Sequence, residues 1–107
     1  MNVKRICIFL ALMLIAGSAF CKTIRSKKIK EFVISVIYDS DYKYYYVYVE
    51  DHNHYNVYCM NASKDKNEAI GWYENVGSSD LPMLRSLANY HGWSSYREVN
   101  GWTMYFR

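Results

Sequence analysis

Residues 42–60, YKYYYVYVEDHNHYNVYCM, predict the central hairpin of a β-sheet. Tyrosine and valine favour extended strands, and they recur along 42–50 and again along 54–60, on either side of a short polar break. Because strand side chains alternate between two faces, we expect one face to hold the core and the other a row of tyrosines. The predicted core face contains Tyr45, Val47, Val49, Tyr55, Val57 and Cys59, and the predicted tyrosine face contains Tyr44, Tyr46, Tyr48, Asn56 and Tyr58.

One strand is expected before this hairpin and two helices after it. Residues 31–38, EFVISVIY, are rich in β-branched residues and predict the first strand of an antiparallel meander. Apolar residues recur at helical spacing along 64–76 and again along 81–88. Gly92 is typical of a residue that ends the second helix.

The C-terminal end predicts a second hairpin. Asn100 and Gly101 lie between alternating apolar residues, and this pair favours a type I′ turn because both positions need positive φ. The turn joins 93–99 to 102–107. It is expected to place four large side chains on a helix-facing side: Trp93, Trp102, Met104 and Phe106.

These elements predict an α+β domain. The expected architecture is an antiparallel sheet of about five strands, in the order β-β-β-α-α-β-β, with two helices packed on one face. Residues 31–107 are expected to form this single domain, since they contain neither a repeat nor an internal linker.

The N-terminus has the pattern of a secretory signal peptide, assigned to residues 1–19. Lys4 and Arg5 form a basic start, residues 6–16 form an apolar run, and small residues follow it. The run of 11 residues is shorter than the ~20 needed to cross a membrane. We therefore expect cleavage, no stable membrane insertion afterwards, and a secreted or periplasmic protein.

The position of the cut decides the cysteine chemistry. Cleavage after residue 18, 19 or 21 satisfies the small-residue rule, and Ser18 and Phe20 disfavour a lipoprotein signal around Cys21. If Cys21 is retained, an oxidising compartment would allow a Cys21–Cys59 disulfide. If it is lost, Cys59 is expected to be a buried small apolar residue.

Charge divides the remaining chain into two parts. Residues 20–30 are expected to form a basic arm, because KTIRSKKIK at 22–30 carries five Lys or Arg. Residues 31–107 carry six Lys or Arg against ten Asp or Glu. The arm would either bind an anionic surface electrostatically or serve as a solvated spacer. A nucleic-acid partner is disfavoured because the aromatic residues lie in the acidic part.

The tyrosine row is the first candidate site. An uncovered face carrying Tyr44, Tyr46, Tyr48 and Tyr58 would bind a protein or carbohydrate partner through ring contacts and hydroxyl hydrogen bonds. The alternative is that these rings only pair across strands. The favoured hypothesis is a secreted or periplasmic non-catalytic binding module that needs no cofactor.

The turn from Glu50 to His54 is the competing site. His52 and His54 beside carboxylates are weak metal-ligand candidates and would suit a small secreted enzyme or metal-binding protein. No phosphate-binding loop, nucleophile motif or paired-acid spacing supports catalysis. Asn61-Ala62-Ser63 would be a glycosylation acceptor in a predicted loop if the pathway is eukaryotic.

Residues 81–107 carry the pattern of a known domain. Spaced leucines at Leu84 and Leu87 precede Gly92-Trp93, and the chain closes with Phe106-Arg107. The segment resembles the end of a small uncharacterised bacterial domain family. That resemblance implies a helix packed on a small antiparallel sheet and supplies no activity. Two features depart from the family pattern: Ser94 stands where an acid is usual, and three predicted strands precede the helices.

Overall fold

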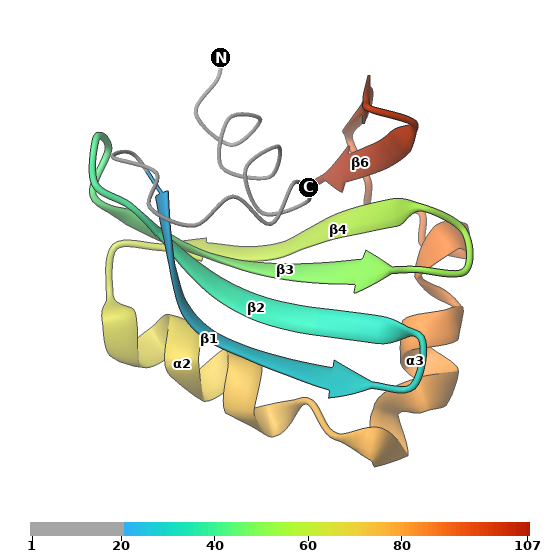
Figure 1. Ribbon diagram of the computed structural model, residues 1–107, viewed down its shortest axis with the longest axis horizontal. Coiled ribbons are helices and arrows are strands. Elements are labelled where there is room, and N and C mark those ends of the chain that lie inside the picture. The colour runs from blue at the N-terminus through green and yellow to red at the C-terminus, as the bar shows by residue number, and fades with distance from the viewer. Residues whose placement is uncertain (1–20) are drawn as a thin grey trace.

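A meander of four strands forms the larger part of the sheet in the computed structural model, which describes residues 21–107 (Figure 1). Each neighbouring pair is antiparallel. The three tight turns use residues with positive φ at Lys30 (54°), Lys43 (58°) and Tyr55 (56°). The strands are β1 (Cys21–Ile29), β2 (Phe32–Asp39), β3 (Tyr44–Asp51) and β4 (Asn56–Ser63).

The C-terminal part adds two helices and a hairpin. The chain leaves β4 through α2 (Lys66–Asn75), the 3₁₀ turn Ser78–Asp80, α3 (Leu81–Arg85) and the 3₁₀ turn Leu87–Asn89. It returns through β5 (Ser95–Val99) and β6 (Trp102–Phe106), with β6 parallel to β4. The strand order is β1-β2-β3-β4-β6-β5.

The predicted α+β class is confirmed, but the sheet has six strands instead of about five and is mixed instead of antiparallel, because β6 runs parallel to β4. Helix α2 packs on β2, β3 and β4, and both helices lie on the same side of the sheet (Figure 1). The turn between β5 and β6 has positive φ at Asn100 (52°) and Gly101 (84°), as a type I′ turn requires. The sheet has six strands because β1 extends it at one edge.

Residues 21–29 of the expected basic arm form strand β1 of the sheet. Two of its basic side chains contact α2: the Lys27 ammonium donates to the carbonyl oxygen of Tyr73 at 2.7 Å, and Arg25 Nη1 lies 2.6 Å from Glu74 Oε2 in an exposed ion pair. Ile29 is buried in the core. The folded domain therefore begins at least ten residues earlier than residue 31.

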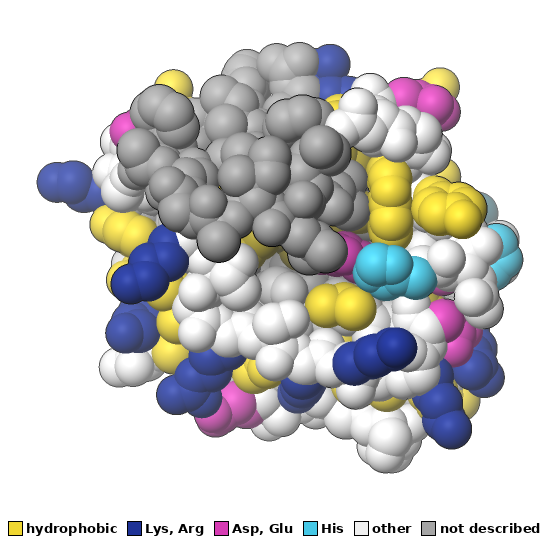
Figure 2. All heavy atoms as spheres, in the orientation of Figure 1, with side chains coloured by type: hydrophobic (Ala, Val, Ile, Leu, Met, Phe, Trp, Pro, Cys, Tyr) yellow, Lys and Arg dark blue, Asp and Glu magenta, His cyan; other side chains and the backbone are white. Residues whose placement is uncertain are grey.

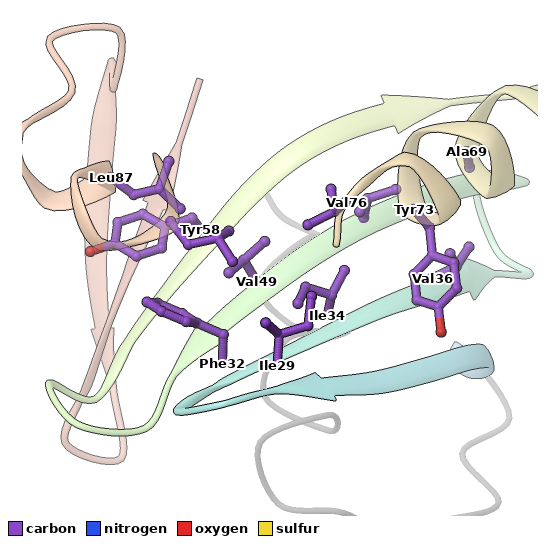
Figure 3. Packing of buried hydrophobic residues seen from close by; sticks show 12 residues of the cluster. Ile29, Phe32, Ile34, Val36, Val49, Tyr58, Ala69, Tyr73, Val76 and Leu87 are labelled. Atoms are coloured by element: carbon purple, nitrogen blue, oxygen red, sulfur yellow. The ribbon is translucent and has the colours of Figure 1, made fainter. Parts of the chain in front are cut away.

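The main core lies between the sheet and the helices, as Figure 3 shows. Val47 and Val49 of β3 point into it from the sheet, as predicted, and Leu84 and Leu87 contribute from the helical segment. Each such side chain stabilises the fold by roughly 1.5–3 kcal/mol when fully buried.

The predicted assignment of β4 side chains to the two faces is wrong, because the turn after β3 is one residue longer than the expected three-residue break. Asp51 pairs with Asn56, so the turn holds four residues, and Tyr58 therefore pairs with Val49 on the helix-covered face. Val57 and Cys59 lie on the opposite face, with Tyr46 and Tyr48. We refer to this side as the second face; its buried or partly buried hydrophobic residues are Cys21, Ile37, Tyr44, Tyr46, Tyr48, Val57, Cys59, Val99, Trp102, Met104 and Phe106.

The predicted helix-facing side of the C-terminal hairpin is wrong for three of its four side chains. Trp102, Met104 and Phe106 lie on the second face, and Trp93 packs on the helix side as predicted. The predicted signal peptide lies outside the described residues. Among residues 21–107, no helix is long and apolar enough to cross a membrane.

Candidate functional site

The tyrosine row of β3 is present but buried. Tyr44, Tyr46 and Tyr48 stack along the second face, with ring centroids 6.1 Å and 5.7 Å apart. Tyr46 and Tyr48 are only 3% and 1% exposed. Burial raises the pKa of Tyr46 to about 12 and holds the pKa of Tyr48 well above its usual value. The row does not present open ring faces, and Tyr58, predicted to belong to it, lies on the other face.

The two histidines of the β3–β4 turn are held apart. His52 Nε2 lies 3.0 Å from Glu50 Oε1, and His54 Nδ1 lies 2.9 Å from Asp51 Oδ2. Glu50 and Asp51 are consecutive strand residues, so their carboxylates lie on opposite faces of the sheet. Among the described residues, no group of three or more His, Cys, Asp or Glu could hold a metal ion. The predicted metal candidates are not brought together.

Glu50 is the acid that the competing hypothesis needs. It is 6% exposed, and burial raises the pKa of its carboxyl group, while the hydrogen bond from His52 opposes that shift. Trp102 covers the His52 ring edge-on at a centroid distance of 5.0 Å. The arrangement is a single acid–imidazole pair against an indole, with the carboxyl group of Glu50 buried and the His52 ring half exposed.

The sheet order excludes the predicted Cys21–Cys59 disulfide. Cys21 is on β1 and Cys59 on β4, three strand spacings apart, which corresponds to about 14 Å. A disulfide needs α-carbons within roughly 7 Å. Cys59 is a buried thiol, 4% exposed, as in the alternative interpretation.

Asn61 lies in β4 and not in the predicted loop. It pairs with Val47 in the middle of the sheet, and its side-chain oxygen is buried without a hydrogen-bond partner. A glycan needs an acceptor on a surface loop. The position of Asn61 therefore disfavours glycosylation.

A different group of rings reaches the surface on the helix side of the β5–β6 hairpin. We call it the hairpin aromatic cluster, and its innermost ring is Tyr58, which is 1% exposed. Tyr58 stacks on Tyr105 at 5.1 Å and on Trp93 at 5.3 Å. Burial raises the pKa of Tyr58 to about 12, and Asn56 Nδ2 donates to its hydroxyl oxygen at 3.1 Å. The cluster consists of Tyr58, Tyr90, Trp93, Tyr96 and Tyr105.

The outer rings of the cluster are open to solvent. Tyr90 meets Trp93 edge-on at 5.2 Å, and Tyr96 leans on Tyr105 at 6.3 Å. Tyr90 is 45% and Tyr96 is 68% exposed. The guanidinium of Arg107 lies over the Tyr90 ring at 5.9 Å, which is a cation–π distance. The cluster thus runs from a buried base to an exposed rim that includes one positive charge.

Two local features fix these rings. Trp93 Nε1 donates to the carbonyl oxygen of Leu87 at 2.8 Å, which anchors the indole to the 3₁₀ turn before it. A Cβ at Gly92 would lie 2.1 Å from the Tyr90 ring, so only glycine lets that ring fold back here. Trp93 is therefore anchored and Tyr90 lies against it, whereas Tyr96 is restrained only by its contact with Tyr105.

Sequence reasoning missed this surface because Trp93 was assigned to the core and the tyrosines beside it were not paired. The predicted Asn100-Gly101 turn already contains the signal: counting outward from it places Tyr96 opposite Tyr105. What sequence could not show is that Tyr58 of β4 lies underneath.

No known protein family, curated protein or solved structure matches the chain. The function is therefore argued from the geometry above.

Proposed function

We propose that this protein is a non-catalytic binding module that holds a protein partner on the hairpin aromatic cluster. The observation that carries the proposal is that Tyr90 and Tyr96 are exposed while they contact Trp93 and Tyr105. Trp93 and Tyr105 in turn stack on the buried ring of Tyr58. Tyrosine, tryptophan and arginine dominate the energetics of protein interfaces, and pre-ordered rings lose little entropy on binding.

A protein partner suits the cluster better than a carbohydrate. Sugar binding would use flat ring faces and side-chain hydrogen bonds, but Tyr58 and Tyr105 stack on each other at an interplanar angle of 14°. The Trp93 indole N–H is already used by Leu87. The groups that remain are the exposed parts of Tyr90 and Tyr96 and the Arg107 guanidinium, one nitrogen of which already donates to the carbonyl oxygen of Met60. These groups can meet backbone carbonyls, apolar side chains and acids of a protein.

The proposal includes a location outside the cytoplasm. Its support is the signal-like pattern of residues 1–19 in the sequence. The proposed surface replaces the predicted tyrosine row of Tyr44, Tyr46, Tyr48 and Tyr58. Its residues lie at the C-terminal hairpin, with Tyr58 retained as a buried support.

Selection of binders from a displayed random peptide library tests the proposal. Selected peptides are expected to shift the amide and indole NMR signals of Trp93, Tyr96 and their neighbours, and the Tyr96→Ala variant is expected to lose about tenfold or more in affinity. Tyr42→Ala is the matched control, because Tyr42 is 57% exposed but lies in the β2–β3 turn.

Two results would contradict the proposal. One is that peptides selected on the wild-type protein bind Tyr96→Ala and Tyr42→Ala equally well. The other is that soluble oligosaccharides, and no peptides, shift the signals of the cluster.

A further inference from the structure

The two edges of the sheet are built differently. Strand β1 forms one edge, and its register with β2 is interrupted between Thr23 and Arg25. It also carries Lys22, Lys27 and Lys28, and Figure 2 shows Lys and Arg side chains spread along this side of the molecule. Bulges and lysines on an edge strand prevent further strands from pairing with it. The β1 edge is therefore protected.

Strand β5 forms the opposite edge and has none of this protection. Its register with β6 is regular from Ser95 to Val99, and its sequence SYREV contains neither lysine nor proline. Residues 95–98 are exposed, and no strand within residues 21–107 pairs with its outer side. An open edge of this kind offers backbone N–H and C=O groups to another extended chain.

We infer that the outer edge of β5 accepts an extended segment of the partner protein as a seventh, antiparallel strand. The inference rests on the proposed function and names its binding mode, because the edge lies directly beside the hairpin aromatic cluster through Tyr96. Backbone hydrogen bonds to β5 supply affinity, and the side chains on the cluster side of the segment supply specificity.

The charges of β5 define the chemistry of the incoming segment. Tyr96 and Glu98 point to the cluster side, while Arg97 points to the second face, since it pairs with Met104. Cross-strand neighbours of opposite charge are favoured, and aromatic residues pair well with aromatic or β-branched ones. The segment should carry an acid opposite Arg97, a base opposite Glu98 and an aromatic or β-branched residue opposite Tyr96.

A partner of this chemistry fits better than a second copy of the chain. The two-fold register that pairs all of β5 with itself is centred on Arg97. It would set two Arg97 side chains directly against each other, and like charges in that position are destabilising. Self-association through β5 is therefore disfavoured.

The probe for the test is the labelled peptide acetyl-Thr-Val-Lys-Glu-Tyr-Thr-amide, titrated to millimolar concentration by fluorescence anisotropy. Two further versions carry backbone N-methyl groups, one at the first, third and fifth residues and the other at the second, fourth and sixth. Only one set of N–H groups in an added strand points to β5, so one version is expected to lose about tenfold or more in affinity while the other binds nearly as the parent. Bound peptide should also slow hydrogen exchange of β5 amides.

A charge exchange supplies the second arm. The double variant Arg97→Glu, Glu98→Lys is expected to prefer a peptide with Lys and Glu exchanged, and to bind the parent peptide several-fold more weakly. Lys28→Glu on β1 is the matched control and should leave both affinities unchanged. Because all these substitutions are at exposed positions, folding is preserved and can be confirmed by circular dichroism.

The inference is overturned if the parent peptide does not bind, if both N-methylated versions bind equally well, or if the charge exchange changes no preference. In those cases library-selected peptides that still depend on Tyr96 would leave the proposed function standing with a different binding mode. Loss of both results would remove the proposed function as well.

Discussion

The ammonium group of Lys27 lies over the ring of Tyr73 at 4.4 Å and donates to the carbonyl oxygen of the same residue at 2.7 Å. It also donates to the carbonyl oxygen of Val76, so one side chain of β1 serves two carbonyls at the C-terminal end of α2. A positive charge at this end of a helix is favourable because the helix dipole is negative there and the carbonyls of the last turn can accept further hydrogen bonds.

Replacement of Lys27 by methionine should destabilise the protein. The change keeps most of the aliphatic packing and removes the charge and both hydrogen bonds, which corresponds to about 1–2 kcal/mol of the free energy of unfolding. Denaturant titration measures this loss. Lys28→Met, at the next and exposed position, is expected to cost less than about 0.5 kcal/mol, and equal losses for both variants would show that Lys27 does not cap the helix.

The ion pair between Glu31 and Arg85 should make the free energy of unfolding depend on pH in the acid range. Arg85 donates to both oxygens of Glu31, at 2.8 Å and 2.9 Å, and this lowers the pKa of the carboxyl group from 4.5 to about 2. The unfolded chain therefore takes up this proton first as the pH falls. The contribution of the pair is complete above pH 4.5 and is lost as the pH falls towards 2.

The measurement is the midpoint of thermal unfolding between pH 2 and pH 7, for the wild type and for Glu31→Gln. The variant should show a shallower loss of stability on the acid side. An identical slope in both proteins would mean that Glu31 does not titrate as its hydrogen bonds require.

The buried Tyr58 hydroxyl should make the free energy of unfolding depend on pH in the alkaline range. Its pKa is raised from 10.0 to about 12 by burial, so the unfolded chain releases this proton at lower pH than the folded protein. The free energy of unfolding should therefore fall as the pH rises from 10 towards 12. Tyr58→Phe should flatten this decline, with Tyr42→Phe as the exposed control. Phenolate absorbance that shows Tyr58 ionising together with the exposed tyrosines would refute the expectation.

Substitution by alanine should displace a neighbouring ring at Gly92 and should be accommodated without a clash at Gly71. At Gly92 the added Cβ meets the Tyr90 ring at 2.1 Å, so the ring must leave Trp93 and the indole fluorescence should change. At Gly71, inside α2, nothing lies within 4 Å of the added Cβ, and alanine should stabilise the protein by about 0.5–1 kcal/mol. An unchanged indole signal in Gly92→Ala would show that Tyr90 does not need this glycine.

Local patterns were sufficient to predict most elements, because each depends on neighbouring residues. The alternation of Tyr45, Val47 and Val49 identified the helix-covered side of β3, and Asn100-Gly101 identified the second hairpin. Strand β1 was not predicted, because a run of lysines usually indicates a solvent-exposed segment. In the structure Lys27 binds the C-terminal end of α2. That contact arises only once the helix is in place.

The candidate site was harder to predict from the sequence, because it depends on the register between distant segments. Tyr55 adopts positive φ and lengthens the β3–β4 turn to four residues, which moves Tyr58 to the face opposite to the one expected. The parallel pairing that sets Tyr58 against Tyr105 joins strands more than forty residues apart, and no local pattern reports it.

That parallel junction also sets an order of assembly. Strand β6 is registered with β4 through three residue pairs, whereas the four strands of the meander are each joined to the next by seven or eight. Contacts between neighbouring segments close cheaply and early, and distant ones close last. We therefore expect the docking of the hairpin on β4 to be the last step of assembly, so that Tyr58 meets Tyr105 and the hairpin aromatic cluster is complete only when the rest of the domain has formed.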